Sequence, residues 1–125
     1  MITIQQEVFT SNSIKDFVVE DLPKVVDTRG FIYIVQDSVF PNHFKIGRTC
    51  DMYKRLLAYN SDKPYPTTNL THISKEFKDC VLVETKILEH LYSKTSPTTF
   101  KKEWFDIVHL GLAMDLIEKA EVHFE

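Results

Sequence analysis

The sequence has few of the residues that build disulfide frameworks, flexible linkers or membrane spans. Its 125 residues include two cysteines, three glycines and one tryptophan. Cys50 and Cys80 show no metal-ligand spacing, so we expect free thiols in a reducing compartment. No apolar run approaches the roughly 18 residues that a transmembrane helix needs, and the N-terminus lacks the features of a signal peptide. We therefore expect a cytoplasmic protein that makes no membrane contact.

Length and composition indicate one globular domain. Hydrophobic residues make up 43% of the chain and charged residues 26%, which is ordinary for a soluble domain. A chain of 125 residues leaves no room for two independent cores. Residues 1–29, with a possible strand at 1–9, are predicted to form an N-terminal extension that packs on the domain edge or reaches a partner. That partner is a second copy or another protein, and residues 30–125 form the domain.

From residue 30 onward, the apolar pattern predicts alternating strands and helices. Strands are expected at residues 31–35, 44–49 and 70–77, with a hairpin turn at 37–43 and a loop at 62–69. Helices are expected at 52–60, 79–93 and 108–122, and a short buried segment at 103–107. Asp51 is the expected N-cap of the first helix. This order predicts an α+β fold: a three-stranded, mostly antiparallel sheet flanked by helices.

Positive charge is concentrated in one segment. Residues 43–63 hold five cations and two anions, a net charge of +3 in a chain of net charge −3, so the remainder carries −6. A local basic surface on an acidic body suits contact with phosphate at one site better than indiscriminate binding of nucleic acid. A solvated helix face is the alternative explanation. The five cations are Lys45, Arg48, Lys54, Arg55 and Lys63.

Glu84 lies near the middle of the apolar face of the second predicted helix, at about 100° per residue. A carboxylate in that position must be paired, protonated or bound to a metal. A functional carboxylate and a structural ion pair with a core cation both satisfy this requirement. The apolar face is formed by Val81, Ile87, Leu88, Leu91 and Tyr92.

Three other residues have both an ordinary and a functional explanation. Gly47, within a predicted strand, marks a bulge or a close approach to the backbone. Arg55 lies at the edge of the first helix's apolar face, formed by Met52, Leu56 and Tyr59, where a long side chain can simply reach solvent. Tyr33 lies between isoleucines and fits a core tyrosine with a satisfied hydroxyl.

The order and spacing of these residues resemble the GIY-YIG nuclease superfamily. The matching elements are Gly30-Phe31-Ile32-Tyr33, Phe44-Lys45-Ile46-Gly47-Arg48-Thr49, Arg55-Leu56, Glu84 and Glu103-Trp104-Phe105. The likeness covers residues 30–107 and is closest to the phage and large-virus branch, whose second half-motif reads KIG. In the first half-motif one residue is inserted between the glycine and the Ile-Tyr pair. In the last motif, Glu103 and Trp104 lie where many nucleases have asparagine.

The resemblance implies a role for each matched residue. Tyr33 would be the general base that activates water, helped by nearby cations because a phenol has a pKa near 10. Lys45 stands in place of the second tyrosine, as in some restriction enzymes of the superfamily, and would lower the Tyr33 pKa or act as the base itself. Arg55 would stabilise the charge on the five-coordinate phosphorus, and Tyr59 matches a position that is often histidine or tyrosine. Glu84 would be the single acidic ligand of Mg²⁺ or Mn²⁺.

The resulting prediction is a metal-dependent endonuclease that hydrolyses DNA phosphodiester bonds, nicking as a monomer, with Arg48, Lys54 and Lys63 near the phosphates. The alternative is an inactive scaffold of the same fold that binds nucleic acid or protein. A third possibility is a structural subunit, in which Arg55 and Glu84 would form a direct buried ion pair.

Overall fold

The computed structural model describes residues 27–95 and 104–124. In this part of the chain four strands form one antiparallel sheet in the order β4-β2-β3-β5. The α+β class is therefore confirmed, and the short segment predicted near residue 105 adds a fourth strand to the expected three. The possible strand at residues 1–9 lies outside the described residues. The strands are β2 (Phe31–Asp37), β3 (Phe40–Thr49), β4 (Thr68–Ile73) and β5 (Trp104–Asp106).

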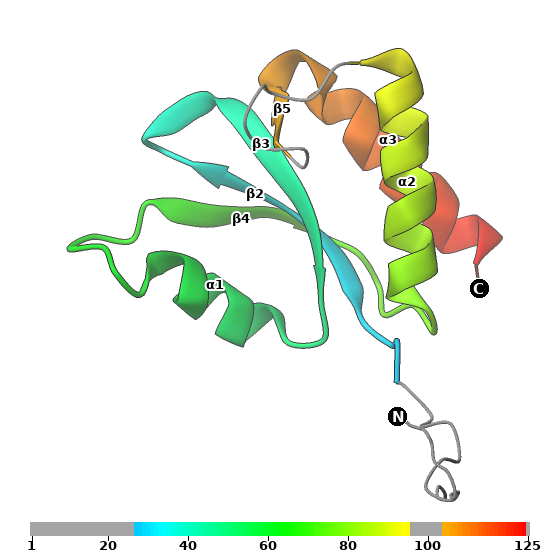
Figure 1. Ribbon diagram of the computed structural model, residues 1–125, viewed down its shortest axis with the longest axis horizontal. Coiled ribbons are helices and arrows are strands. Elements are labelled where there is room, and N and C mark those ends of the chain that lie inside the picture. Colours follow the sequence, from blue (N-terminus) through cyan, green and yellow to red (C-terminus); the bar gives the residue numbers. More distant parts are fainter. Residues whose placement is uncertain (1–26, 96–103, 125) are drawn as a thin grey trace, which may run out of the picture.

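Helices cover both faces of this sheet. Helix α1 (Met52–Asn60) lies on one face, and α2 (Cys80–Lys94) and α3 (Leu110–His123) pack together on the other (Figure 1). A 3₁₀ turn, η1 (Ile107–His109), leads into α3. No helix in the described ranges combines the length and the apolar character that crossing a membrane requires.

The two faces follow from the alternation of side chains along a strand. Ile32 and Ile34 of β2 and Phe44 and Ile46 of β3 are fully buried in the core that α2 and α3 complete. The intervening residues, including Tyr33, point to the α1 side, where Tyr33 meets Tyr59. One face of the sheet therefore builds the hydrophobic core, and the other presents polar groups toward α1.

The hairpin turn is shorter than predicted. We expected a turn over residues 37–43 because of Pro41 and Asn42, but β3 already begins at Phe40. The Asp37 carboxylate accepts a hydrogen bond from the Val39 N–H at 2.9 Å, which closes a tight turn at residues 38 and 39. Pro41 is tolerated in the strand because β5 pairs only with residues 43–45, so β3 has an open edge there in the described structure.

Other boundaries and faces differ from the prediction by small amounts. The third strand begins two residues earlier and ends four residues earlier than predicted, and α3 starts two residues later because Asp106 caps the η1 turn. Val81 and Tyr92, predicted on the apolar face of α2, are each 39% exposed. The buried face of α2 is rotated from the predicted one and includes Cys80, Val83, Glu84, Ile87 and Leu91.

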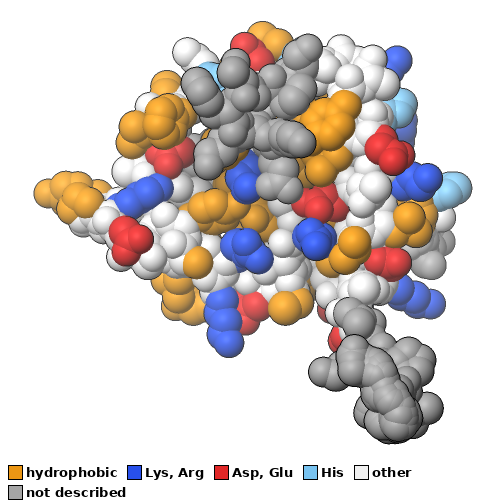
Figure 2. Space-filling view, in the orientation of Figure 1, with side chains coloured by type: hydrophobic (Ala, Val, Ile, Leu, Met, Phe, Trp, Pro, Cys, Tyr) orange, Lys and Arg blue, Asp and Glu red, His pale blue; other side chains and the backbone are white. Residues whose placement is uncertain are grey.

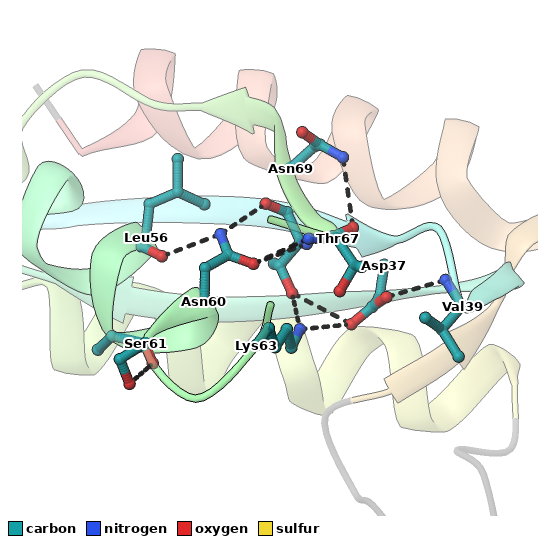
Figure 3. A network of polar contacts seen from close by, with 10 residues as sticks. Asp37, Val39, Leu56, Asn60, Ser61, Lys63, Thr67 and Asn69 are labelled. Atoms are coloured by element: carbon teal, nitrogen blue, oxygen red, sulfur yellow. Dashed lines mark hydrogen bonds and ion pairs between the residues drawn. The ribbon is translucent and has the colours of Figure 1, made fainter. Parts of the chain in front are cut away.

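A polar network ties the end of α1 to β4 (Figure 3). The Asn60 side-chain oxygen accepts from the N–H groups of Thr67 and Thr68 at 3.1 and 3.0 Å. Its amide donates to the carbonyl oxygens of Leu56 and Thr68 at 3.3 and 3.0 Å. One side chain thus satisfies four backbone groups at a helix end and a strand start, and it fixes α1 against the sheet.

Gly47 makes room for Tyr33. The two residues are partners across the β2–β3 ladder. A Cβ at Gly47 would lie 2.4 Å from the Tyr33 hydroxyl oxygen and 2.5 Å from its Cζ, so the ring occupies the space that any other residue would fill. The close approach predicted from the sequence is therefore that of the Tyr33 phenol.

Gly47→Ala is expected to lower the free energy of unfolding by about 1–3 kcal/mol, because the methyl group forces the buried ring of Tyr33 to move. Thermal unfolding followed by circular dichroism measures the change. Gly111→Ala in α3 is the matched control: a Cβ there meets nothing within 4 Å, and alanine favours a helix by up to about 1 kcal/mol. Equal melting temperatures for the two variants would contradict this packing.

Candidate active site

Arg48 and Glu84 meet at the unpaired edge of β3, and Arg55 shares a recess with Arg48 there. Strand β5 pairs only with His43, Phe44 and Lys45, so residues 46–49 have no partner strand on that side within the described chain. Helices α1 and α2 stand on either side of this edge (Figure 1). Residues from both faces of the sheet can therefore reach one surface.

On the α1 side, Tyr33 and Tyr59 form a hydrogen-bonded pair. Their hydroxyl oxygens are 2.8 Å apart, and their rings meet edge to face at 76° with centroids 6.3 Å apart. Tyr33 is 1% exposed, whereas Tyr59 is half-buried on the face that α1 turns toward the sheet. The pair links a buried phenol to the molecular surface.

Burial raises the pKa of Tyr33 well above its ordinary value, and the hydrogen bond with Tyr59 adds to the rise. Arg55 and Lys45 are close enough for their charges to lower the pKa, as the sequence led us to expect. Their effect is smaller than that of burial. The net change in the pKa is therefore upward, and Tyr33 is a neutral phenol at neutral pH.

The raised pKa of Tyr33 predicts a loss of stability in alkali. Below about pH 10 the phenol is protonated in the folded and in the unfolded protein, so Tyr33 makes its full contribution to the free energy of unfolding. Above about pH 10 the phenol ionises in the unfolded chain while it stays protonated in the folded protein, so the free energy of unfolding falls as the pH rises. The stability advantage of wild type over Tyr33→Phe should therefore shrink as the pH rises from about 9 to 11. Urea unfolding of both proteins across this range measures it. An advantage that stays constant throughout would contradict the assignment.

On the α2 side, Glu84 forms an ion pair with Arg48. Glu84 Oε1 accepts from Arg48 Nη1 at 3.1 Å, and the Glu84 side chain is 8% exposed whereas that of Arg48 is 43% exposed. The inward placement of Glu84 predicted from helix geometry is therefore confirmed. Among the described residues Arg48 makes this ion pair, not Arg55. The direct Arg55–Glu84 ion pair that we expected of a purely structural subunit is therefore not the one observed.

Three arginines line a recess beside this ion pair. We call it the arginine recess: a hollow of about 330 Å³ whose walls include Arg29, Arg48 and Arg55 together with Cys50 and Cys80. Figure 2 shows Lys and Arg side chains gathered across the middle of this face, with acidic and apolar side chains between them. One guanidinium group can donate two parallel hydrogen bonds to two oxygens of a phosphate. The side chains of the recess are therefore of the kind that binds a phosphodiester.

Glu84 lies close to this recess. Cys80, in the recess wall, is one helical turn before Glu84 on α2. Burial raises the pKa of the Cys80 thiol, while the charges of Arg48 and Glu84 act on it in opposite directions. The carboxylate and the arginines are thus near neighbours. Both cysteines are free thiols, with Cys50 exposed and Cys80 buried.

Arg29 is the residue of this recess that the sequence analysis missed. Its guanidinium lies 3.8 Å from Asp27, and both side chains are well exposed. Its position in the sequence, directly before Gly30 and the first core strand, placed it in the extension. A cation immediately preceding a half-motif glycine was the signal available.

Lys63 and Lys54 lie apart from the recess. The Lys63 ammonium donates to Asp37 Oδ2 at 2.9 Å and to Thr68 Oγ1 at 2.8 Å, which pins the loop before β4 to the hairpin turn (Figure 3). Although burial acts to raise the pKa of Asp37, the hydrogen bonds from Lys63 and from the Val39 N–H hold it below its usual value. Lys63 therefore has an internal partner. Lys54 is exposed on the first turn of α1, where a nucleic-acid contact stays a prediction.

The donor set fits a metal that takes most of its ligands from outside the protein. The described residues contain no group of three or more His, Cys, Asp or Glu side chains able to enclose an ion. Glu84 is a single hard carboxylate beside an arginine-lined recess, and such a donor suits Mg²⁺ or Mn²⁺ held largely by ligands from outside the protein. Glu103, near the last motif, lies outside the described residues.

Comparison with known proteins gives one match. The family description of the T5orf172 domain matches residues 30–121. No curated protein and no solved structure matches the chain.

Proposed function

Because the chain belongs to the T5orf172 domain family, we propose that it is a metal-dependent endonuclease that hydrolyses DNA phosphodiester bonds by a GIY-YIG-type mechanism. The domain is phage-associated and linked to endonuclease-like proteins, so membership itself indicates a nuclease-like or DNA-binding role. The observation that carries the finer proposal is the juxtaposition of a buried carboxylate, Glu84, with the arginine recess at the open edge of β3.

In this proposal the arginines hold the scissile phosphate. Arg55, exposed on α1, and Arg48, partly exposed on β3, approach the recess from two elements. Two guanidinium groups fix a phosphodiester in position before reaction and stabilise the additional negative charge that develops on its oxygens. Substrate phosphate would compete with Glu84 for Arg48, which would leave the carboxylate able to hold Mg²⁺. The ion would neutralise the charge that develops on the leaving oxygen.

The tyrosine pair supplies a path for the proton of the attacking water. A neutral Tyr33 cannot simply remove this proton, because its own pKa is raised. Its oxygen can instead accept the proton while its hydroxyl proton passes to Tyr59, 2.8 Å away, and from there to solvent. One proton enters and one leaves, so no phenolate accumulates. Lys45, whose charge favours the deprotonated phenol, lowers the cost of this transfer.

Relaxation of supercoiled plasmid tests the proposal. The purified protein should convert supercoiled to open-circular DNA with Mg²⁺, and addition of a chelator should stop the reaction. A single active site cuts one strand, so linear product should appear only after open circles accumulate. Failure to nick DNA of any form at Mg²⁺ or Mn²⁺ concentrations that support other nucleases would count against it.

A nucleic-acid-binding module without catalysis is the second candidate. The Arg48–Glu84 ion pair favours it, since Arg48 already neutralises the carboxylate that the enzyme would need for the metal, and Lys45 replaces the second motif tyrosine. Calorimetric titration with Mn²⁺ in the presence of a short DNA duplex separates the two. An enzyme should bind the ion in a manner that depends on Glu84, whereas a binding module has no need of it.

A further inference from the structure

A second basic surface lies between α2 and α3, lined by residues outside the arginine recess. Here the two helices enclose an open groove of about 400 Å³ with an apolar floor that includes Ile87, Leu116 and Phe124. Four basic side chains and no acidic ones contribute to its lining: Lys86 and His90 from α2, and Lys119 and His123 from α3. On the right of Figure 2, over these helices, Lys, Arg and His side chains lie at the surface with acidic side chains among them.

The proposed nuclease mechanism uses none of these side chains. Lys119 pairs with Asp115 at 3.0 Å along α3, but both side chains are more than half exposed, so this contact is weak and readily exchanged. An apolar floor with a cationic rim suits an amphipathic segment that carries acidic residues beside its apolar face.

Residues 13–22 of the same chain have that character. Their sequence, SIKDFVVEDL, carries one lysine and three acidic residues, a net charge of −2. Ile14, Phe17, Val18 and Leu22 recur at helical spacing and would share one face, onto which Asp21 also falls. The flanking residues carry helix-boundary signals as well: Ser13 followed three residues later by Asp16 is a capping-box pattern, and Pro23 is a stop signal.

The point where the described chain begins lies within reach of the groove. The Thr28 carbonyl accepts from the N–H of Cys80, the first residue of α2, and the groove starts one turn later at Val83. Four residues separate Leu22 from Asp27, and the chain across them spans up to about 17 Å. A ten-residue helix is about 15 Å long, comparable to the stretch of α2 from Val83 to His90.

From this charge complementarity and reach, we infer that the groove between α2 and α3 is the docking site of residues 13–22 of the same chain. Phe17 and Leu22 enter the apolar floor, and Asp16 and Glu20, which lie beside the apolar face, are turned toward Lys86 and Lys119. The inference concerns the far side of the core from α1 and is independent of whether the protein cleaves DNA.

Photo-crosslinking in the full-length chain tests this docking. Phe17→benzoylphenylalanine should form adducts that map to residues 83–90 or 116–124. The double variant Lys86→Glu/Lys119→Glu should lower their yield about fivefold or more, the equivalent of losing roughly 1 kcal/mol. Lys54→Glu/Lys75→Glu, with the same change in charge at exposed positions that do not line the groove, should leave the yield unchanged. The probe at Glu20, on the acidic side of the segment, should give fewer adducts with the floor.

The competing arrangements have different signatures. Adducts that map elsewhere, or a yield that does not respond to Lys86→Glu/Lys119→Glu, would overturn the inference. Mixing isotopically heavy and light chains before illumination separates docking within one chain from docking on a second copy. Predominantly mixed heavy–light adducts would show exchange between copies and would overturn the same-chain assignment.

Discussion

Glu84→Gln is expected to reduce Mg²⁺-dependent DNA cleavage by roughly a hundredfold to a thousandfold while the protein stays folded. The amide has nearly the same shape as the carboxylate and can still accept a hydrogen bond from Arg48, so the packing around residue 84 survives. What disappears is the negative charge that would hold the ion beside the scissile phosphate. Single-turnover cleavage of a labelled duplex, with circular dichroism to verify folding, measures the effect.

The matched control for this variant is Glu89→Gln, which removes the same charge from an exposed position on the same helix. It should cleave at the wild-type rate. If Glu84→Gln and Glu89→Gln cleave equally well, Glu84 is a structural carboxylate and its ion pair with Arg48 is its whole role. Raising the Mn²⁺ concentration adds a second readout, because a weakened metal site should recover part of its activity and an unrelated defect should not.

Arg55→Ala is expected to slow the chemical step by about a hundredfold to a thousandfold, the usual cost of removing one preorganised donor to a developing oxyanion. Arg55 is exposed on a helix without fully buried residues, so its truncation leaves the core untouched. The loss should appear in the single-turnover rate constant at saturating DNA rather than in the affinity for DNA.

Lys54→Ala on the same turn of α1 distinguishes chemistry from attraction. A phosphate contact at Lys54 should weaken DNA binding and reduce its salt dependence by about one ion, with little change in the single-turnover rate constant. Two variants with the same loss of affinity and unchanged rate constants would mean that Arg55 serves only to attract the substrate.

The parts of the fold that could be predicted are those that local sequence dictates. Asp51 caps α1 by accepting from the Lys54 N–H at 3.0 Å, and the helix covers the predicted residues. The hairpin turn was predicted too long, because the composition of residues 37–43 is typical of a loop. Its actual length is set by the hydrogen bond from Val39 to Asp37 and by the pairing of β3 with β2. The three-residue strand β5 was predicted only as a short buried segment, because its strand conformation depends on pairing with β3.

In the candidate site, too, some features could be predicted from the local sequence and others could not. Helix geometry alone placed Glu84 inward, and a glycine in a strand signalled the close approach of Tyr33. The partners of these residues could not be predicted, because they come from distant elements. Arg48 takes the ion pair with Glu84, Lys63 turns inward to Asp37, and burial outweighs the cations that surround Tyr33.

One plasmid-nicking experiment tests the central claim most directly: wild type, Tyr33→Phe and Glu84→Gln are assayed side by side, with Mg²⁺ and with a chelator. We predict that wild type nicks supercoiled DNA only with the metal, that Tyr33→Phe is strongly impaired because the proton path through Tyr59 is lost, and that Glu84→Gln is inactive. Equal nicking by wild type and Glu84→Gln would contradict the account.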